Sequence, residues 1–264
     1  MKIVVCIKQV PDTNEVKLDP KTNRLIRDGV PSIINHDDKS GIEAALQLRE
    51  KVGGTVTVVC MGPPQADVAL REALAMGCDD AYLLSAREFG GSDTCATAII
   101  ISTALKKIGY DLVITGRQAI DGDTAQVGPQ IAEKLGLPQI SYAAEIVKEG
   151  NEVTVKRMLE DGYMKIKVQT PCLITCISDQ DSKARYMTLN GINHCYEKPY
   201  LVLDFEALKD EPLIELDKIG LKGSPTNIFK SFTPPQKGVG TMLEGADKNT
   251  AETLANILLE KHVI

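Results

Sequence analysis

The sequence contains no tryptophan and has only three histidines and four phenylalanines among its 264 residues. It also lacks an apolar stretch that approaches the roughly 20 residues of a membrane-spanning helix. The opening residues MKIVVCIKQVPDT read as a strand and not as a signal peptide, so we expect a cytoplasmic protein without membrane insertion. The net charge is −6, and no dense cluster of lysine or arginine occurs. Nucleic acid is therefore not expected as the main partner, because clustered cations hold its phosphate backbone.

Several chemical signatures are missing as well. The chain has no CxxC pair, no GxGxxG loop and no P-loop lysine, which argues against the usual dinucleotide fingerprint and against γ-phosphate chemistry. The seven cysteines are an odd number, lie mostly in apolar runs and are typical of reduced, buried thiols. Cys172 and Cys176 should share one face of a strand, and the histidines are scattered, so we expect no structural zinc site.

Apolar runs and amphipathic helical patterns alternate through the first 137 residues. The runs KIVVCI, TVTVVCM, DAYLLS and DLVIT are short and continuous, as buried parallel strands are. Helical patterns lie in SGIEAALQLREK, QADVALREALAM, GSDTCATAIIISTALKKI and TAQVGPQIAEKL, with Gly77 and Gly109 as stops and Ser92 or Asp93 as a cap. The alternation predicts an α/β fold, in which helices cover both faces of a parallel sheet.

The period of the hydrophobic pattern changes after about residue 139. Residues 139–178 contain strand-like stretches separated by EGN and EDG, which are hairpin turn signals, and we expect an antiparallel extension on the edge of the sheet. Residues 199–247 are rich in proline, glycine and lysine, and NTAETLANILLEKHV closes the chain as a helix. We therefore assign residues 1–190 to an α/β domain and residues 191–264 to a C-terminal arm that lies along a partner subunit.

The stretch GRQAIDGDTAQVGP, residues 116–129, follows the fourth strand. Ligands of open parallel sheets collect at the carboxyl ends of the strands, and a helix beginning near Asp123 or Thr124 would offer free N–H groups to an anion. Thr124 and Gln126 add side-chain donors, and we expect backbone amides to hold a diphosphate there without any cation. The alternative is that Asp123 only caps the helix. GGSDT, residues 90–94, is interpreted as a helix cap and not as a pyrophosphate loop.

Several linked motifs resemble the β subunit of electron-transferring flavoproteins, and the resemblance covers nearly the whole chain. The motifs are VVCIKQVPDT, INHDDKSGIEAALQLRE, VCMGPPQADVALREALAMGCDDAYLL, DLVITGRQAIDGDTAQVGPQIAEKLGLPQ, VKRMLEDGYMKIKVQTPCLITC and ARYMTLNGI. The resemblance implies a Rossmann-like domain for an adenine nucleotide. It also implies a heterodimer with an α subunit that carries the working FAD and is wrapped by the C-terminal arm of the β chain.

The resemblance further implies which residues hold the nucleotide: Cys6, Asn35, His36, Asp37, Asp38, Met61, Asp121, Asp123, Thr124, Ala125, Gln126, Val127 and Gly128. The phosphates would meet the segment from Thr124 to Gly128, and Asp37 or Asp38 would accept ribose hydroxyls. Plainer roles stay open for three of these residues. Cys6 and Met61 also suit core packing, and Asn35 also suits capping of the helix that follows it.

Two variants of the family differ in the ligand of this site. In housekeeping members the ligand is AMP, which has a structural role. In electron-bifurcating members the ligand is a FAD that takes a hydride from NADH. The loop RQAIDGDTAQVGP and the tail IGLKGSPTNIFKSFTPPQKGVGTMLEG resemble the bifurcating type. We therefore expect FAD here, with AMP as the alternative, a second FAD in the α subunit and NADH as the electron donor. No nucleophile–base pair is evident, so we expect an electron carrier whose chemistry belongs to the flavin.

ARYMTLNGI resembles the loop through which the family docks on acyl-CoA dehydrogenases. Leu189 would be an apolar anchor, with Tyr186 and Met187 beside it. The alternative is that Leu189 packs into the core of its own chain. The sequence departs from the family pattern at Ala184, where proline is usual, and at NHCYEK, which replaces a lysine run. The identity of the dehydrogenase is therefore left open.

Two other classes of protein have a similar fold. A universal-stress-type nucleotide-binding protein would lack the extension and the arm of residues 139–264. An adenylating ligase would carry a phosphate loop directly after the first strand, where this chain has KQVPDT. The electron-transfer subunit is therefore favoured over both.

Overall fold

The computed structural model describes residues 1–12, 31–178, 183–226, 238 and 240–264. The chain divides into two units, Met1–Asn227 and Ile228–Ile264. Residues 191–226, which the sequence analysis assigned to the arm, belong to the first unit, and β11 within them pairs in parallel with β5. The second unit contains the expected final helix, α8 (Lys248–Glu260), whose first turn is capped by Asp247.

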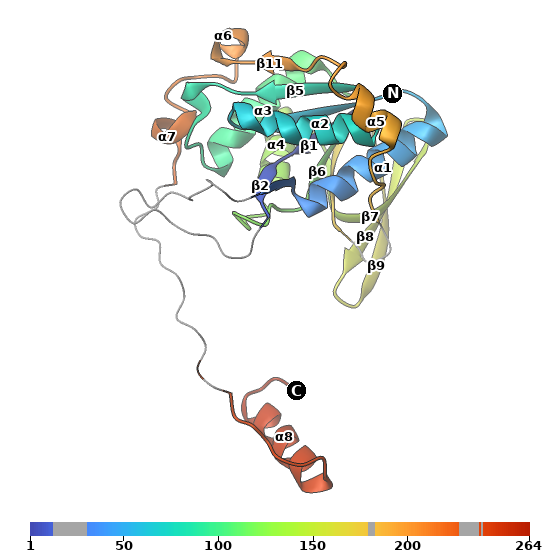
Figure 1. The fold of residues 1–264 in the computed structure, drawn as a ribbon, viewed down its shortest axis with the longest axis vertical. Coiled ribbons are helices and arrows are strands. Elements are labelled where there is room, and N and C mark those ends of the chain that lie inside the picture. Colours follow the sequence, from blue (N-terminus) through green and yellow to red (C-terminus); the bar gives the residue numbers. More distant parts are fainter. Residues whose placement is uncertain (13–30, 179–182, 227–237, 239) are drawn as a thin grey trace. The chain divides into compact units, whose positions relative to one another are not determined.

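The first unit is built on one large sheet (Figure 1). Its strand order is β11-β5-β4-β1-β6-β10-β7-β8-β9. Neighbouring strands are parallel from β11 to β7, and β7, β8 and β9 form an antiparallel meander. The strands of this sheet are β1 (Lys2–Ile7), β4 (Thr55–Met61), β5 (Asp80–Leu84), β6 (Leu112–Gly116), β7 (Gln139–Glu149), β8 (Glu152–Leu159), β9 (Gly162–Gln169), β10 (Cys172–Cys176) and β11 (Leu201–Leu203). A separate antiparallel pair joins β2 (Gln9–Pro11) to β3 (Ser32–Ile34).

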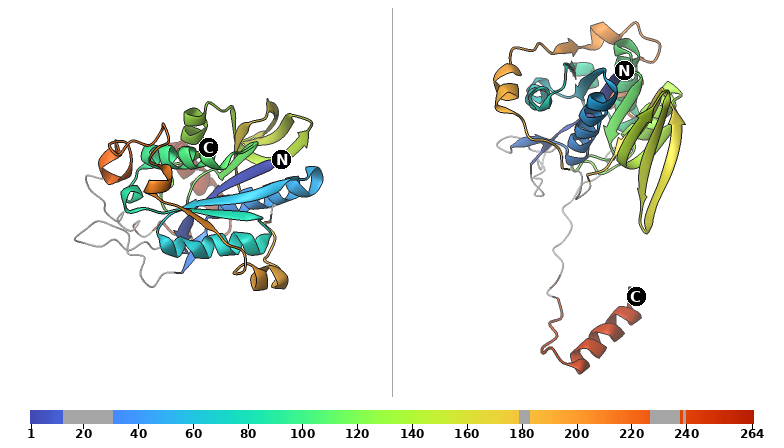
Figure 2. Two further views of the ribbon diagram at one scale, coloured as in Figure 1. Left: turned by 90° about the horizontal axis from the view of Figure 1, so that it is seen from above. Right: turned by 90° about the vertical axis from the view of Figure 1, so that its right-hand side faces the viewer.

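Helices cover both faces of the sheet (Figure 2), which confirms the predicted fold class. The helices of the first unit are α1 (His36–Val52), α2 (Asp67–Met76), α3 (Thr94–Ile108), α4 (Val127–Leu135), α5 (Leu189–His194), α6 (Phe205–Leu208) and α7 (Gly220–Gly223), with 3-10 turns at Pro64–Ala66 and Arg87–Phe89. No helix in the described ranges is both long and apolar enough to cross a membrane.

Alternate residues of the central strands face different helical layers. In β1, Ile3, Val5 and Ile7 pack in the core that contains α1 and α2. Val4 and Cys6 pack in the other core, which contains α3 and α4. Because successive side chains of a strand point to opposite faces, a strand covered on both sides must be apolar at every position. This explains why KIVVCI and its neighbours are continuous apolar runs.

The ends of two helices agree with the prediction, and the start of a third does not. α2 and α3 end at Gly77 and Gly109, as expected. α4, however, begins at Val127 and not near Asp123 or Thr124. Asp123 lies in the left-handed region, with φ at 48°, so the backbone before Val127 is not helical.

β10 also differs from the prediction. Cys172–Cys176 was expected within the antiparallel extension, but the strand lies between β6 and β7 and is parallel to both. Cys172 and Cys176 pack into the same core, so their expected position on one face of a strand is confirmed. The extension proper therefore consists of β7, β8 and β9, attached to the parallel sheet through β10.

Candidate functional site

A cavity of about 940 Å³ opens where the central parallel strands end. Its walls come from the carboxyl ends of β1, β4, β5 and β6, from the loops that follow them and from the starts of α3 and α4. This is the edge at which open α/β sheets bind their ligands. The cavity is also within the size range of small-molecule and cofactor sites.

Nine of the predicted site residues line the cavity, and four do not. Those in the lining are Cys6, Asp38, Met61, Asp123, Thr124, Ala125, Gln126, Val127 and Gly128. Asn35, His36, Asp37 and Asp121 are absent from the lining. Asn35 and Asp37 contact the loop between β6 and α4 from outside the cavity, and Asp121 belongs to that loop.

The loop between β6 and α4 has an unusual backbone. Asp123 and Ala125 have φ values of 48° and 52°, which non-glycine residues rarely adopt. The Asp123 carboxylate accepts a hydrogen bond from the Gln118 amide and does not cap α4. The interpretation of Asp123 as a helix cap is therefore wrong. Strained backbone of this kind clusters at ligand sites, where the surrounding structure holds it in place.

Asn35 holds this loop through its side chain. Its amide nitrogen donates to the Gln118 carbonyl (2.8 Å), and its amide oxygen accepts from the Ile120 N–H (3.1 Å). The Asn35 side chain makes no hydrogen bond to the first turn of α1, so the capping alternative is wrong. The residue is fully buried. Asn35 thus shapes the loop from behind the cavity, because both ends of its amide are already used.

Asp38 joins the ends of β1 and β6 at the floor of the cavity. One carboxylate oxygen accepts from the Lys8 N–H (2.8 Å) and the other from the Gly116 N–H (3.0 Å). Burial raises the pKa of Asp38 to about 7, against the opposing effect of these hydrogen bonds. Gly116 is required here, because a Cβ at this position would lie 2.1 Å from the nearer Asp38 oxygen.

Cations line the cavity, whereas the sequence analysis named none; a phosphate site without any cation stays a prediction. Lys8, Arg87 and Arg117 all line the cavity. Lys8 pairs with Asp121 at 2.6 Å, and Arg117 Nε lies 3.4 Å from a carboxylate oxygen of Asp37. These two acids therefore pair with cations of the cavity wall, and neither acid is part of the cavity lining.

The sequence analysis missed one wall of the cavity. The loop after β5 lines it with Ser85, Phe89, Gly90, Gly91, Ser92, Asp93, Thr94 and, one turn into α3, Thr97. Asp93 caps α3 by accepting from the Ala96 N–H (2.9 Å), as predicted for GGSDT, but the same loop also faces the cavity. The Thr94 hydroxyl donates to the Gln126 side chain (2.9 Å) and so links this wall to the β6–α4 loop. The sequence did contain a signal for this wall. DAYLLS was predicted as a parallel strand, and the loops that follow parallel strands lie at the same edge of the sheet.

The predicted docking residues form an exposed apolar cluster at and before α5. Tyr186 is 95% exposed, Leu189 77% and Met187 41%. The alternative that Leu189 packs into the core of its own chain is therefore wrong. Thr188 caps α5 by accepting from the Gly191 N–H (2.9 Å). A Cβ at Gly191 would lie 2.1 Å from the Ala75 carbonyl oxygen, so the backbone of α5 lies directly against the end of α2.

All seven cysteines are free, and six of them are buried. Burial raises the pKa of Cys60 and of Cys176 to about 12, and it keeps that of Cys6 well above its usual range. Because the thiolate is the reactive form, we expect iodoacetamide to label only the partly exposed Cys95 in the native protein at pH 8. Peptide mass spectrometry would check this, with the urea-unfolded protein as the control. Rapid native labelling of Cys6 would contradict it.

Comparisons with known proteins agree with one another. A family model for the electron transfer flavoprotein domain matches residues 22–188. The acryloyl-CoA reductase electron transfer subunit gamma of Anaerotignum propionicum is 65% identical. The electron transfer flavoprotein subunit beta of Thermoanaerobacterium thermosaccharolyticum is 52% identical. The caffeyl-CoA reductase-Etf complex subunit CarD of Acetobacterium woodii is 51% identical. Each of these alignments covers 100% of both chains.

Proposed function

The chain belongs to the electron transfer flavoprotein family, as an electron-transfer subunit of the β type, and we propose that the cavity at the carboxyl edge of its sheet binds FAD. Bound FAD would supply the electron and hydride chemistry, and the residues of this chain bind and orient it. The observation that carries the proposal is the cavity itself, with its volume of about 940 Å³ and its mixed lining. Family membership leaves no support for a universal-stress-type protein or an adenylating ligase.

The lining suits the parts of an adenine dinucleotide. Cys6 and Met61 offer apolar, polarisable walls to a flat ring system. The N–H groups of Val127 and Gly128 lie in the first turn of α4, where no intrahelical acceptor exists, and they are available to a phosphate. Lys8 lines the cavity near the same loop, and its ammonium group, which pairs with Asp121, keeps further N–H donors for an anion.

AMP remains the second candidate for the site, because the same phosphate-binding features would serve it. The cavity volume favours FAD, since a mononucleotide would leave much of the space unfilled. We expect denaturation of the purified αβ complex to release two FAD molecules per complex and no AMP. Chromatography of the supernatant, with absorbance at 260 and 450 nm, would measure both. Release of one FAD together with one AMP would contradict the proposal.

The names of the relatives support a role in an acyl-CoA reducing complex. One is an electron transfer subunit of acryloyl-CoA reductase and another belongs to a caffeyl-CoA reductase–Etf complex. We infer a heterodimer with an α subunit that carries the second FAD and contacts the unit Ile228–Ile264. We further infer NADH as the electron donor in an electron-bifurcating reaction, and an acyl-CoA dehydrogenase that docks at Tyr186, Met187 and Leu189. The free, buried thiols favour a cytoplasmic location.

A further inference from the structure

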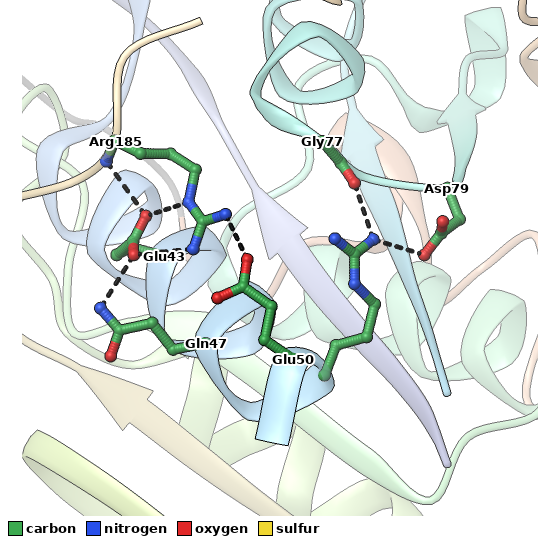
Figure 3. Close-up of polar contacts among 7 residues, drawn as sticks. Glu43, Gln47, Glu50, Gly77, Asp79 and Arg185 are labelled. Carbon is green, nitrogen blue, oxygen red and sulfur yellow. Dashed lines mark hydrogen bonds and ion pairs between the residues drawn. The ribbon is translucent and has the colours of Figure 1, made fainter. Parts of the chain in front are cut away.

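Arg185 makes the most extensive side-chain ion-pair network in the described part of the chain (Figure 3). Its Nε donates to one Glu43 oxygen (2.8 Å) and its Nη2 to the other (3.1 Å), which is a two-pronged arrangement. Its Nη1 donates to Glu50 (2.6 Å), and its backbone N–H donates to Glu43 as well (3.0 Å). Gln47 completes the network by donating to Glu43 (2.8 Å). All three partners lie on α1.

The network binds Glu43 more tightly than Glu50. The side chain of Glu43 is 9% exposed and that of Glu50 51%, so solvent screens the second pair far more. Burial opposes ionisation of Glu43, but the hydrogen bonds from Arg185 outweigh it and hold the pKa of Glu43 below its usual range. Planar, two-pronged pairing of this kind is specific to arginine, because lysine offers only a single point charge.

The network lies directly beside the exposed apolar cluster. Arg185 precedes Tyr186, which is 95% exposed, and Leu189 follows three residues later with its side chain 77% exposed. On the other side of the cluster, Gly191 presses against the end of α2 at Ala75. The backbone of this short segment is therefore fixed at both ends, although the side chains of Tyr186 and Leu189 are mostly exposed to solvent. Such fixing lowers the ordering cost of binding a partner.

We propose that Arg185 is a positioning residue for docking, which holds residues 186–189 on α1 so that their apolar side chains meet the acyl-CoA dehydrogenase in one conformation. This inference rests on the proposed docking function. It assigns no contact with the dehydrogenase to Arg185 itself. When the network is removed, only a fraction of the molecules presents the docking conformation, and the apparent affinity falls by that fraction.

The test uses the αβ complex, with the acryloyl-CoA reductase of Anaerotignum propionicum as the partner probe. We expect Arg185→Gln to raise the half-saturating concentration of the reductase about tenfold, while kcat and flavin content stay unchanged. Arg185→Lys keeps the charge but loses the two-pronged geometry, and it should fall between the wild type and Arg185→Gln. A half-saturating concentration that is unchanged in Arg185→Gln would overturn the proposal.

Arg49 provides a matched control on the same helix. It donates to the carbonyl of Gly77 (2.8 Å) and to Asp79 (3.0 Å), both labelled in Figure 3, and its side chain is 22% exposed against 31% for Arg185. Arg49→Gln should lower thermal stability to a similar extent but change the half-saturating concentration by less than about twofold, because its hydrogen bonds hold the end of α2 and not the segment from Tyr186 to Leu189. An equal loss of affinity in Arg49→Gln would reduce Arg185 to a general stability role and overturn the proposal.

A double variant separates this inference from the docking function on which it rests. If Arg185 sets only the fraction of molecules in the docking conformation, Leu189→Ala will cost the same factor of affinity in the Arg185→Gln background as in the wild type, because the two factors multiply. A much smaller cost in the Arg185→Gln background would show that the remaining binding does not use the docking conformation, and it would overturn the positioning role. An effect of Leu189→Ala without one of Arg185→Gln would reject the positioning role alone. No effect of Leu189→Ala in the wild type would reject the docking function itself, and the positioning role with it.

Discussion

Gly116→Ala is expected to lower the midpoint of thermal unfolding by roughly 10 °C and to empty the nucleotide cavity. The added Cβ would lie 2.1 Å from an Asp38 oxygen and 2.9 Å from the Asp37 Cβ, so the first turn of α1 must move away from β6. Overpacking a core costs about 1–3 kcal/mol, and leaving a buried hydrogen-bonding group unpaired costs about as much again. The hydrogen bond from Gly116 to Asp38 would be lost in this way.

The measurement is differential scanning calorimetry of the purified protein, together with its content of FAD and AMP. Gly162→Ala is the matched control, since a Cβ at Gly162 would meet nothing within 4 Å. We expect this second variant to keep both its midpoint and its ligand. Normal ligand content in Gly116→Ala would show that the contact between β6 and α1 does not shape the cavity as we describe.

Leu189→Ala is expected to raise the half-saturating concentration of the partner dehydrogenase by about tenfold or more, with unchanged flavin content and thermal stability. The side chain is 77% exposed, so its truncation removes little packing from its own chain. Exposed apolar side chains on a fixed backbone are the usual anchors of a docking surface, and a few such anchors carry most of the binding energy.

Steady-state electron transfer to the dehydrogenase, with the dehydrogenase concentration varied, gives the half-saturating concentration directly. Leu216→Ala serves as the control, because Leu216 has a similar exposure of 60% but lies outside the segment from Tyr186 to Leu189. A comparable loss of affinity in both variants would point to general surface hydrophobicity. A normal half-saturating concentration in Leu189→Ala would refute docking at this residue.

Much of the fold could be predicted because the strands are apolar on both faces. KIVVCI, TVTVVCM and DLVIT correspond to β1, β4 and β6 with shifts of only a residue or so at their ends. CLITC is equally apolar and its strand was expected, but its partners were not, because local pattern carries no information on which strand lies beside it. Hairpin signals at EGN and EDG suggested an antiparallel neighbour for every strand of that region. β10 instead pairs in parallel with β6 and β7, and the β8–β9 hairpin separates it from β7 along the chain.

The candidate site was predictable in outline and not in its internal contacts. The residues from Asp123 to Gly128 line the cavity, as the position of their loop after a parallel strand suggested. The role of Asn35 could not be seen, since its amide spans to Gln118 and Ile120, more than eighty residues away. The residues from Gly90 to Thr94 were set aside because their capping role already explained their composition. A single stretch can both cap a helix and face a ligand.

The insertion of β10 between β6 and β7 has a consequence for the order in which the protein is made. The ribosome delivers β6 and β7 well before the strand that belongs between them, so a nascent chain that ends before residue 172 carries two open sheet edges facing the same gap. Gly128, at the start of α4, lies against Thr175 of this late strand, so the start of α4 lacks this support until β10 has been made. Synthesis of the chain thus leaves backbone of the sheet exposed until then.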